Sequence, residues 1–379
     1  MSVIPDFVAT STDDSALVVA IVAARLLVPL LIPRLPLAIV VALVLDAADQ
    51  TILAEFTDVD TGEDGPYQSY DKALDIYYLT IAYLSTIRNW TSEPAFRVGQ
   101  FLFFYRLVGV TLFELLDERV LLLVFPNTFE YYFIVYELIR LRRDPSAFPA
   151  RVWILLAGGI WVFVKLPQEY WIHVAQRDFT DTVREYPAFG VACVLGVVGV
   201  VALLLFVVRP RLPEPDWSWR LRADPIPTPP ELARERVTHR LSRRFLSLEL
   251  LEEAALLSLV CVIFSQILPG VAVTPVQTIL GISAIVVANF GVSVWSAHRG
   301  GAGLEHTGRV FAVRLTLNFA FVFAATAILA GTEDFPVADG LFFAYLITLF
   351  LVLYDQYRPL YVTRFRRQAP TGARSGASL

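Results

Sequence analysis

Long apolar runs recur along the whole chain and decide the environment in which it can fold. Some 56% of the residues are hydrophobic and only 18% are charged, whereas soluble domains carry nearer a quarter charged residues. A run of about 18 or more mostly apolar residues can cross a bilayer as a helix. The runs predict an all-α polytopic membrane protein with about 11 transmembrane helices, at 16–32, 36–56, 69–87, 98–115, 119–138, 151–166, 188–208, 248–268, 276–297, 309–330 and 338–356.

The distribution of arginine orients these predicted helices. Arginines gather in the loop 139–151, in the long segment 209–247 and in the C-terminal tail. An odd number of predicted spans precedes each of the three, so all of them fall on one side of the membrane. Because loops rich in arginine stay in the cytoplasm, we expect the N-terminus outside and the C-terminus in the cytoplasm. The expected location is a bacterial plasma membrane, with the loops 57–68 and 167–187 outside.

The segment 209–247 divides the chain into unequal parts. It is rich in proline and arginine, so its first part cannot form a regular helix and the whole predicts a basic cytoplasmic linker. The parts are residues 1–208, a charged seven-helix membrane half; 209–247, the linker; 248–367, a four-helix membrane half; and 368–379, a disordered tail. Glycines at 158–159 and within 190–199 predict close helix packing. The second half has few charges deep in its spans, so we expect it to be scaffold.

Charges inside the predicted spans need partners, because a charged side chain at the bilayer centre costs about 3 kcal/mol on insertion scales. Arg25 and Asp46 fall near the midplane of neighbouring antiparallel spans, and so do Arg106 and Glu130. Each pair is predicted to form a buried ion pair. The alternative is that these pairs only fix the register of the helices, since buried pairs need not stabilise a fold.

A second group of polar residues lies nearer the outer surface. Asp71 and Asp75 are four residues apart on one predicted helix face, and Tyr78 lies three residues further on. Two carboxylates at this spacing can hold Mg²⁺ or Mn²⁺ against a pyrophosphate, or can share a proton as acid and base. The simpler interpretation is a solvated helix start whose acids favour the positive end of the helix dipole.

The stretch from Lys165 to Asp181 completes this outer layer. Read as a helix after Pro167, it places Lys165, Glu169, His173 and Arg177 on one face, every fourth residue. Glu169 is predicted to orient His173 for proton transfer. All basic residues are arginine except Lys72 and Lys165. A lysine can lose its proton when desolvated and presents a compact cation, so both lysines are candidates for binding an anionic headgroup. Snorkelling to the interface is the alternative.

These features lead to a first functional hypothesis and two alternatives. The first is a transferase or hydrolase that acts at the outer face on a lipid-linked or anionic substrate. Its predicted catalytic residues are Glu169, His173 and Asp75, and its predicted substrate-binding residues are Lys72, Lys165, Asp71, Tyr78 and Arg177. Mg²⁺ or Mn²⁺ is the candidate cofactor, and no set of dedicated metal ligands is predicted.

The first alternative is a proton-coupled secondary transporter, in which Asp46, Arg106 and Glu130 form a relay at the midplane. The second alternative is a scaffold or assembly subunit of a membrane complex. Nucleic acid is not an expected partner, because the arginines form no patch interleaved with aromatic residues. The sequence has no Walker loop, GxSxG or HExxH motif, so coupling to ATP within this chain is not expected.

Overall fold

The computed structural model describes most of the chain as helix. It covers residues 12–57, 66–171, 175, 179–203, 206, 210, 214–224, 247–267, 274–298, 304–329 and 337–368. Within these ranges all regular structure is helical and no strand occurs. The predicted all-α class is therefore confirmed.

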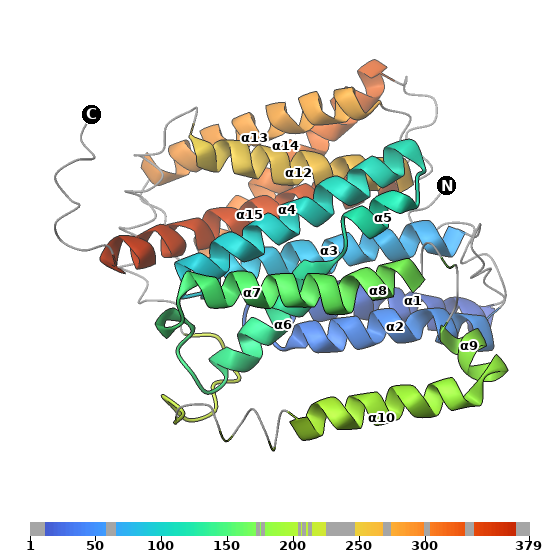
Figure 1. Ribbon diagram of the computed structural model, residues 1–379. Coiled ribbons are helices and arrows are strands. Elements are labelled where there is room, and N and C mark those ends of the chain that lie inside the picture. Colours follow the sequence, from blue (N-terminus) through green and yellow to red (C-terminus); the bar gives the residue numbers. More distant parts are fainter. Residues whose placement is uncertain are drawn as a thin grey trace.

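The first half of the chain forms helices that mostly lie side by side, except for the last of them, which stands apart from the bundle in Figure 1. They are α1 (Thr12–Leu27), η2 (Val28–Leu31), α2 (Ala38–Phe56), α3 (Pro66–Asn89), α4 (Glu93–Leu116), α5 (Val120–Val124), α6 (Thr128–Arg140), η3 (Pro145–Ala147), α7 (Ala150–Ile160), η4 (Trp161–Lys165), α8 (Leu166–Glu169), α9 (Phe179–Glu185) and α10 (Pro187–Leu203). The second half contributes α12 (Leu248–Ile267), α13 (Pro275–His298), α14 (Leu304–Leu329) and α15 (Val337–Gln368).

Helix α3 lies at the centre of the bundle and joins the two halves. It packs against α1, α2 and α4 of the first half and against α12 and α15 of the second. Aromatic residues of α3 and of the position just after it fill the core: the ring of Tyr83 stacks on Phe103 with centroids 4.4 Å apart, and Trp90 stacks on Tyr136 at 3.9 Å. Such pairs add to the hydrophobic gain from burying the rings. The residues that α3 carries on its other faces are thereby held in fixed positions.

Several helices have the length and composition of membrane spans. Within the described residues these are Glu93–Leu116, Ala150–Glu169, Pro275–Trp295, Gly308–Ala325 and Gly340–Phe365. Large apolar side chains face outward from the bundle; Leu155 and Phe163, for example, are 73% and 81% exposed. An apolar exterior on this scale marks contact with a membrane or a partner. The chain therefore has the properties of a membrane-embedded helical protein.

The three arginine-rich segments meet at one end of the bundle. From the tail, Arg364 donates to the carbonyls of Arg88 and Trp90 at 2.5 and 2.6 Å. The described part of the linker, 214–224, lies along the loop after α6: Asp216 and Arg220 donate their backbone N–H groups to the carbonyls of residues 142 and 141, both at 3.0 Å. We call this region the arginine-rich end and define it by residues 33–37, 88–92, 140–149 and 214–224.

Proline changes two of the predicted spans. The span 119–138 is not one helix, because α5 ends at Val124 and α6 begins at Thr128, on either side of Pro126. The helix that starts at Ala150 does not stop at Pro167, where a new helix was predicted to begin. It runs through the proline by widening into the π-helix η4, which accommodates the missing N–H of the proline.

Glycine packing also differs from the prediction. A Cβ added at Gly158, Gly159, Gly196 or Gly199 would have no neighbour within 4 Å, so the prediction is wrong for these four glycines. A Cβ at Gly190 would lie 3.1 Å from the side chain of Val183 on α9, as predicted for a close helix contact. The closest approach lies elsewhere. A Cβ at Gly109 of α4 would come within 2.1 Å of the Cβ of Phe125, at the break between α5 and α6.

Candidate functional site

One buried arginine gathers the acids of three helices. Arg25, in the last turn of α1, is 4% exposed. It forms ion pairs with Asp46 and Asp49 of α2, and its Nη1 lies 2.6 Å from Asp71 of α3. Asp75, one turn further along α3, lies 3.6 Å from Nη2. The predicted Arg25–Asp46 pair is therefore present, but as part of a larger set. We call Arg25 and its four aspartates the acidic cluster.

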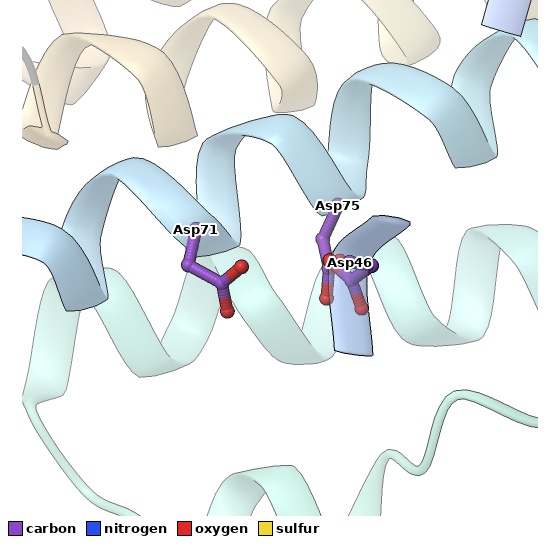
Figure 2. A group of neighbouring side chains, drawn as sticks. All are labelled: Asp46, Asp71 and Asp75. Atoms are coloured by element: carbon purple, nitrogen blue, oxygen red, sulfur yellow. The ribbon is translucent and has the colours of Figure 1, made fainter. Parts of the chain in front are cut away.

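The acidic cluster has more negative charge than its arginine can balance. Carboxylate oxygens of Asp46, Asp71 and Asp75 all lie within 4.8 Å of one another (Figure 2). Excess charge at membrane depth must be neutralised by protons or by a cation. Oxygen ligands of this kind suit Mg²⁺ or Mn²⁺.

A second polar group lies beside the break between α5 and α6. Glu130, in the first turn of α6, accepts a hydrogen bond from the Tyr78 hydroxyl at 2.6 Å and from Asn127 Nδ2 at 3.1 Å. The backbone N–H of Asn127 donates to Glu169 Oε1 at 3.3 Å. Since α6 starts at residue 128, the N–H of Asn127 is not used within a helix and is available to this carboxylate.

Lys165 is buried in the same region as these two glutamates. The last residue of the π-helix, it is 4% exposed, whereas Phe163 two residues earlier faces outward. Its Nζ lies 4.1 Å from the centroid of the Tyr131 ring, and it interacts electrostatically with both Glu130 and Glu169. We call Glu130, Lys165 and Glu169 the buried triad.

The acidic cluster and the buried triad are neighbours. Asp75 and Tyr78 are one helical turn apart on α3, and Asp75 interacts electrostatically with both Glu130 and Lys165. Asp71 and Asp75 lie near the first residue of α3, while Arg88 and Asn89 at its other end belong to the arginine-rich end. The two groups therefore form one polar interior in the half of the bundle away from that end.

The predicted site residues divide into those that the structure brings together and those that it separates. Asp71 and Asp75 lie at Arg25. Tyr78 donates to Glu130, whose partner Asn127 also donates to Glu169. Lys72 points elsewhere: its Nζ lies 4.2 Å from the Phe113 ring centroid of α4, near Glu114. His173 and Arg177 lie outside the described residues.

Both lysines therefore have carboxylate neighbours before any substrate binds. Lys72 is matched by Glu114, and Lys165 by Glu130 and Glu169. Each ammonium also faces an aromatic ring, which adds a cation–π attraction. The lysine charges are therefore compensated within the protein. This favours an internal electrostatic role for both lysines over direct binding of an anionic headgroup.

The predicted Arg106–Glu130 ion pair does not form among the residues that the structure describes. Arg106 Nη1 donates instead to the carbonyl of Phe125 at 3.0 Å. The break between α5 and α6 explains the difference, because it leaves this carbonyl at a helix end without its usual helical donor. Both oxygens of Glu130 already accept hydrogen bonds, from Tyr78 and Asn127.

A polar ladder crosses the second half and was not predicted from the sequence. Asn289 and Ser293 lie one turn apart on α13, and Arg314 and Asn318 lie one turn apart on α14. Arg314 and Asn289 bond across to Ser293 and Asn318, and α15 completes the ladder with Asp355 and Thr348. The four-residue spacing of polar residues inside two apolar helices is the signal that would have revealed it.

Comparison with protein-family models, with curated proteins and with solved structures finds no match to this chain. The functional argument therefore depends on the geometry of the site.

Proposed function

We propose that this chain is a membrane-embedded transferase or hydrolase that acts on a lipid-linked or anionic substrate. The observation that carries the proposal is the convergence of Asp46, Asp71 and Asp75, from two helices, within 4.8 Å. A cluster with this much excess negative charge is suited to recruit a divalent cation, which would hold a phosphate group and polarise it. Glu169 and His173 would move protons at the reacting group near neutral pH.

The membrane arrangement that we propose has 11 spans, with the N-terminus outside and the C-terminus in the cytoplasm of a bacterial cell. Two observations support it: described helices overlap every predicted span, and the three arginine-rich segments share one end. Arginine-rich segments favour the cytoplasmic side. The polar interior would then open towards the outer face.

The test is turnover by the purified protein in detergent. A lipid-linked diphosphate is supplied with Mg²⁺, with Mn²⁺ or with a chelator, and release of phosphate or transfer of the headgroup is measured. We expect activity that the chelator removes. Asp75→Asn, Glu169→Gln and His173→Ala should abolish it while the protein still accumulates in the membrane. Glu93→Gln is the matched control, because Glu93 is exposed and lies on α4 away from the site. If Glu169→Gln and His173→Ala fail to accumulate in the membrane, the stretch from Lys165 to Asp181 is needed for folding. The proposal would then lose its evidence for catalytic residues in that stretch.

A proton-coupled carrier is the second candidate, and the break between α5 and α6 favours it. Carriers often place interrupted helices beside their ion sites at the midplane, and here the interruption contacts Glu130 and Glu169. A carrier needs a sealed membrane and a gradient. Solute uptake into proteoliposomes under an imposed pH gradient, with no turnover in detergent, would select the carrier over the enzyme.

A further inference from the structure

A groove runs along the outside of α4 and starts near the arginine-rich end. Its volume is about 380 Å³, within the range of small-ligand pockets. One of its lining residues, Phe125, comes from the break between α5 and α6, and the others form a single stripe of α4 at helical spacing. The residues of the stripe are Arg97, Gln100, Phe101, Phe104, Tyr105 and Val108. The groove therefore follows the axis of α4.

Aromatic rings form the end of the groove that lies deeper in the predicted span. The ring centroid of Tyr105 lies 4.5 Å from that of Phe125 and 5.0 Å from that of Trp161, the first residue of η4. The Tyr105 hydroxyl donates to the carbonyl of Val124 at 3.0 Å, so the polar atom of this side chain is bonded within the protein. This end of the groove therefore presents ring surface and suits an apolar ligand.

The end of the groove near the arginine-rich end is polar. The side chain of Arg97 is 65% exposed, and its Nη2 lies 3.3 Å from Glu93 Oε1. An exposed pair of this kind within one helix contributes only about 0.3–0.5 kcal/mol. A guanidinium has five N–H donors, so Arg97 can bind a second anion beside this carboxylate. Gln100, one turn further along α4, is held in place because its amide donates to the Tyr83 hydroxyl at 3.1 Å.

The length of the groove matches one leaflet of a bilayer. Arg97 lies one turn after the first residue of α4, at the level where a membrane helix meets the headgroups. At the helical rise of about 1.5 Å per residue, Val108 lies about 16 Å further along the axis. Half of the hydrocarbon core measures about 15 Å. An acyl chain that lies along the stripe from Arg97 would therefore end near the bilayer midplane.

The composition of the stripe favours an acyl chain over a neighbouring helix. Helix interfaces inside membranes are rich in small residues, which let two backbones approach closely. Between Arg97 and Val108 the stripe has no small residue and consists of Gln100, Phe101, Phe104 and Tyr105. Bulky side chains keep a second backbone at a distance, whereas a flexible chain can lie between them. The positive charge at the polar end is complementary to a lipid phosphate.

We propose that this groove binds one anionic phospholipid from the leaflet at the arginine-rich end. Arg97 and Gln100 bind the phosphate, and one acyl chain lies against the rings of Tyr105 and Phe125. The site is distinct from the acidic cluster and the buried triad, so the inference goes beyond the proposed function and holds for an enzyme or a carrier. The lipid would cover the break between α5 and α6 from outside, because Phe125 lines the groove and its carbonyl also holds Arg106.

Native mass spectrometry of the purified full-length protein in detergent tests this site. Phosphatidylglycerol or phosphatidylcholine is titrated, and each bound lipid is counted. We expect the first phosphatidylglycerol to bind on the order of 10-fold more tightly than the first phosphatidylcholine, and Arg97→Gln to remove this advantage, the size of a hydrogen bond to a charged group. Arg184→Gln is the matched control and should change nothing, because Arg184 forms an equally exposed pair with Glu55 at 3.1 Å.

A second pair of variants tests the apolar end of the groove. Val108→Trp fills it and should prevent binding of the first phosphatidylglycerol at concentrations that saturate the wild-type protein. Leu155→Trp is the control, because Leu155 is 73% exposed on α7 and does not line the groove. If Val108→Trp does not fold, Arg97→Gln decides alone, since its side chain is exposed.

Three results would overturn the proposal. If phosphatidylglycerol binds no more tightly than phosphatidylcholine, the groove is ordinary surface in contact with the bilayer. If Arg97→Gln and Val108→Trp both bind phosphatidylglycerol like the wild-type protein, the anionic lipid binds elsewhere. If the wild-type protein is a dimer that Val108→Trp converts to a monomer, a second copy of the chain covers the stripe instead of a lipid.

Discussion

The guanidinium of Arg314 on α14 and the carboxylate of Asp355 on α15 lie 2.5 Å apart, with side chains only 1% and 8% exposed. Ser293 of α13 bonds to both of them. One turn away on α13 and α14, Asn289 donates to Asn318 at 2.6 Å. Two polar rungs thus cross three otherwise apolar helices. Because a slip by one residue would separate every pair at once, the ladder fixes the register of α13, α14 and α15.

The Arg314–Asp355 pair should show strong energetic coupling. We expect Arg314→Leu or Asp355→Leu to lower the free energy of unfolding by about 3–5 kcal/mol, because each leaves a buried charge without its partner. The double variant should recover part of that loss. Denaturant titration in detergent micelles, followed by circular dichroism, measures all four forms. Strictly additive losses would contradict the predicted contact.

The control for this cycle is the exposed pair of Arg97 and Glu93 on α4. Its atoms lie 3.3 Å apart, but the side chains are 65% and 51% exposed. A pair of this kind within one helix contributes about 0.3–0.5 kcal/mol. The same double-mutant cycle there should give a coupling energy several-fold smaller.

The acidic cluster predicts an asymmetry between Arg25 and its partners. Arg25→Leu strands four aspartates and should prevent stable folding or make it depend on acid pH, since only protonation can then neutralise them. Asp46→Asn should be tolerated far better, because it removes one of several like charges and leaves Arg25 with three carboxylates. Membrane accumulation and melting temperature across a pH series distinguish the two. Equal damage from both variants would mean that Arg25 and Asp46 act as a simple pair.

The composition and pattern of the sequence predicted the helical class and the pairing of Arg25 with Asp46. The depth of Arg25 and Asp46 along their spans was sufficient to predict their pairing, because both are fixed by helical rise. Asp71, Asp75 and Tyr78 were found from spacing on one helix for the same reason. Sequence periodicity therefore predicts which residues share one face of a helix and which residues of neighbouring helices lie at the same depth.

The positions that sequence reasoning missed depend on where a helix is interrupted. Pro126 breaks one predicted span, and this gives Arg106 a backbone carbonyl in place of Glu130. Pro167 widens another helix into a π-helix and turns Lys165 inward. Neither outcome follows from hydropathy, because a proline in a membrane helix can produce a kink, a break or a π-turn, and packing decides which.

The proposed topology predicts which positions are reachable from outside the cell. Single cysteines are placed at Asp64, Asp181 and Pro225 in a background with Cys193→Ala and Cys261→Ala. Asp64 and Asp181 should react with an impermeant thiol reagent on intact cells, and Pro225 only after permeabilisation, because it lies in the arginine-rich linker. Labelling of Asp181 and Pro225 from the same side would mean that the chain does not cross the membrane between them, and would remove the basis for an outer-face site.

Gly109 is predicted to tolerate replacement far less well than Gly159. An added methyl group would come within 2.1 Å of the Cβ of Phe125, so α4 and the break after α5 would have to separate. Overpacking of this kind costs about 1–3 kcal/mol.

The displacement also acts on the site, because Arg106 is anchored to the carbonyl of Phe125 and Asn127 follows two residues later. Gly109→Ala should therefore lower both the melting temperature and the turnover of a lipid-linked substrate in detergent. Gly159→Ala, where a Cβ meets nothing within 4 Å, should leave both unchanged, since alanine is the better helix former. If the two variants behave alike, the contact between α4 and Phe125 does not hold the break in place.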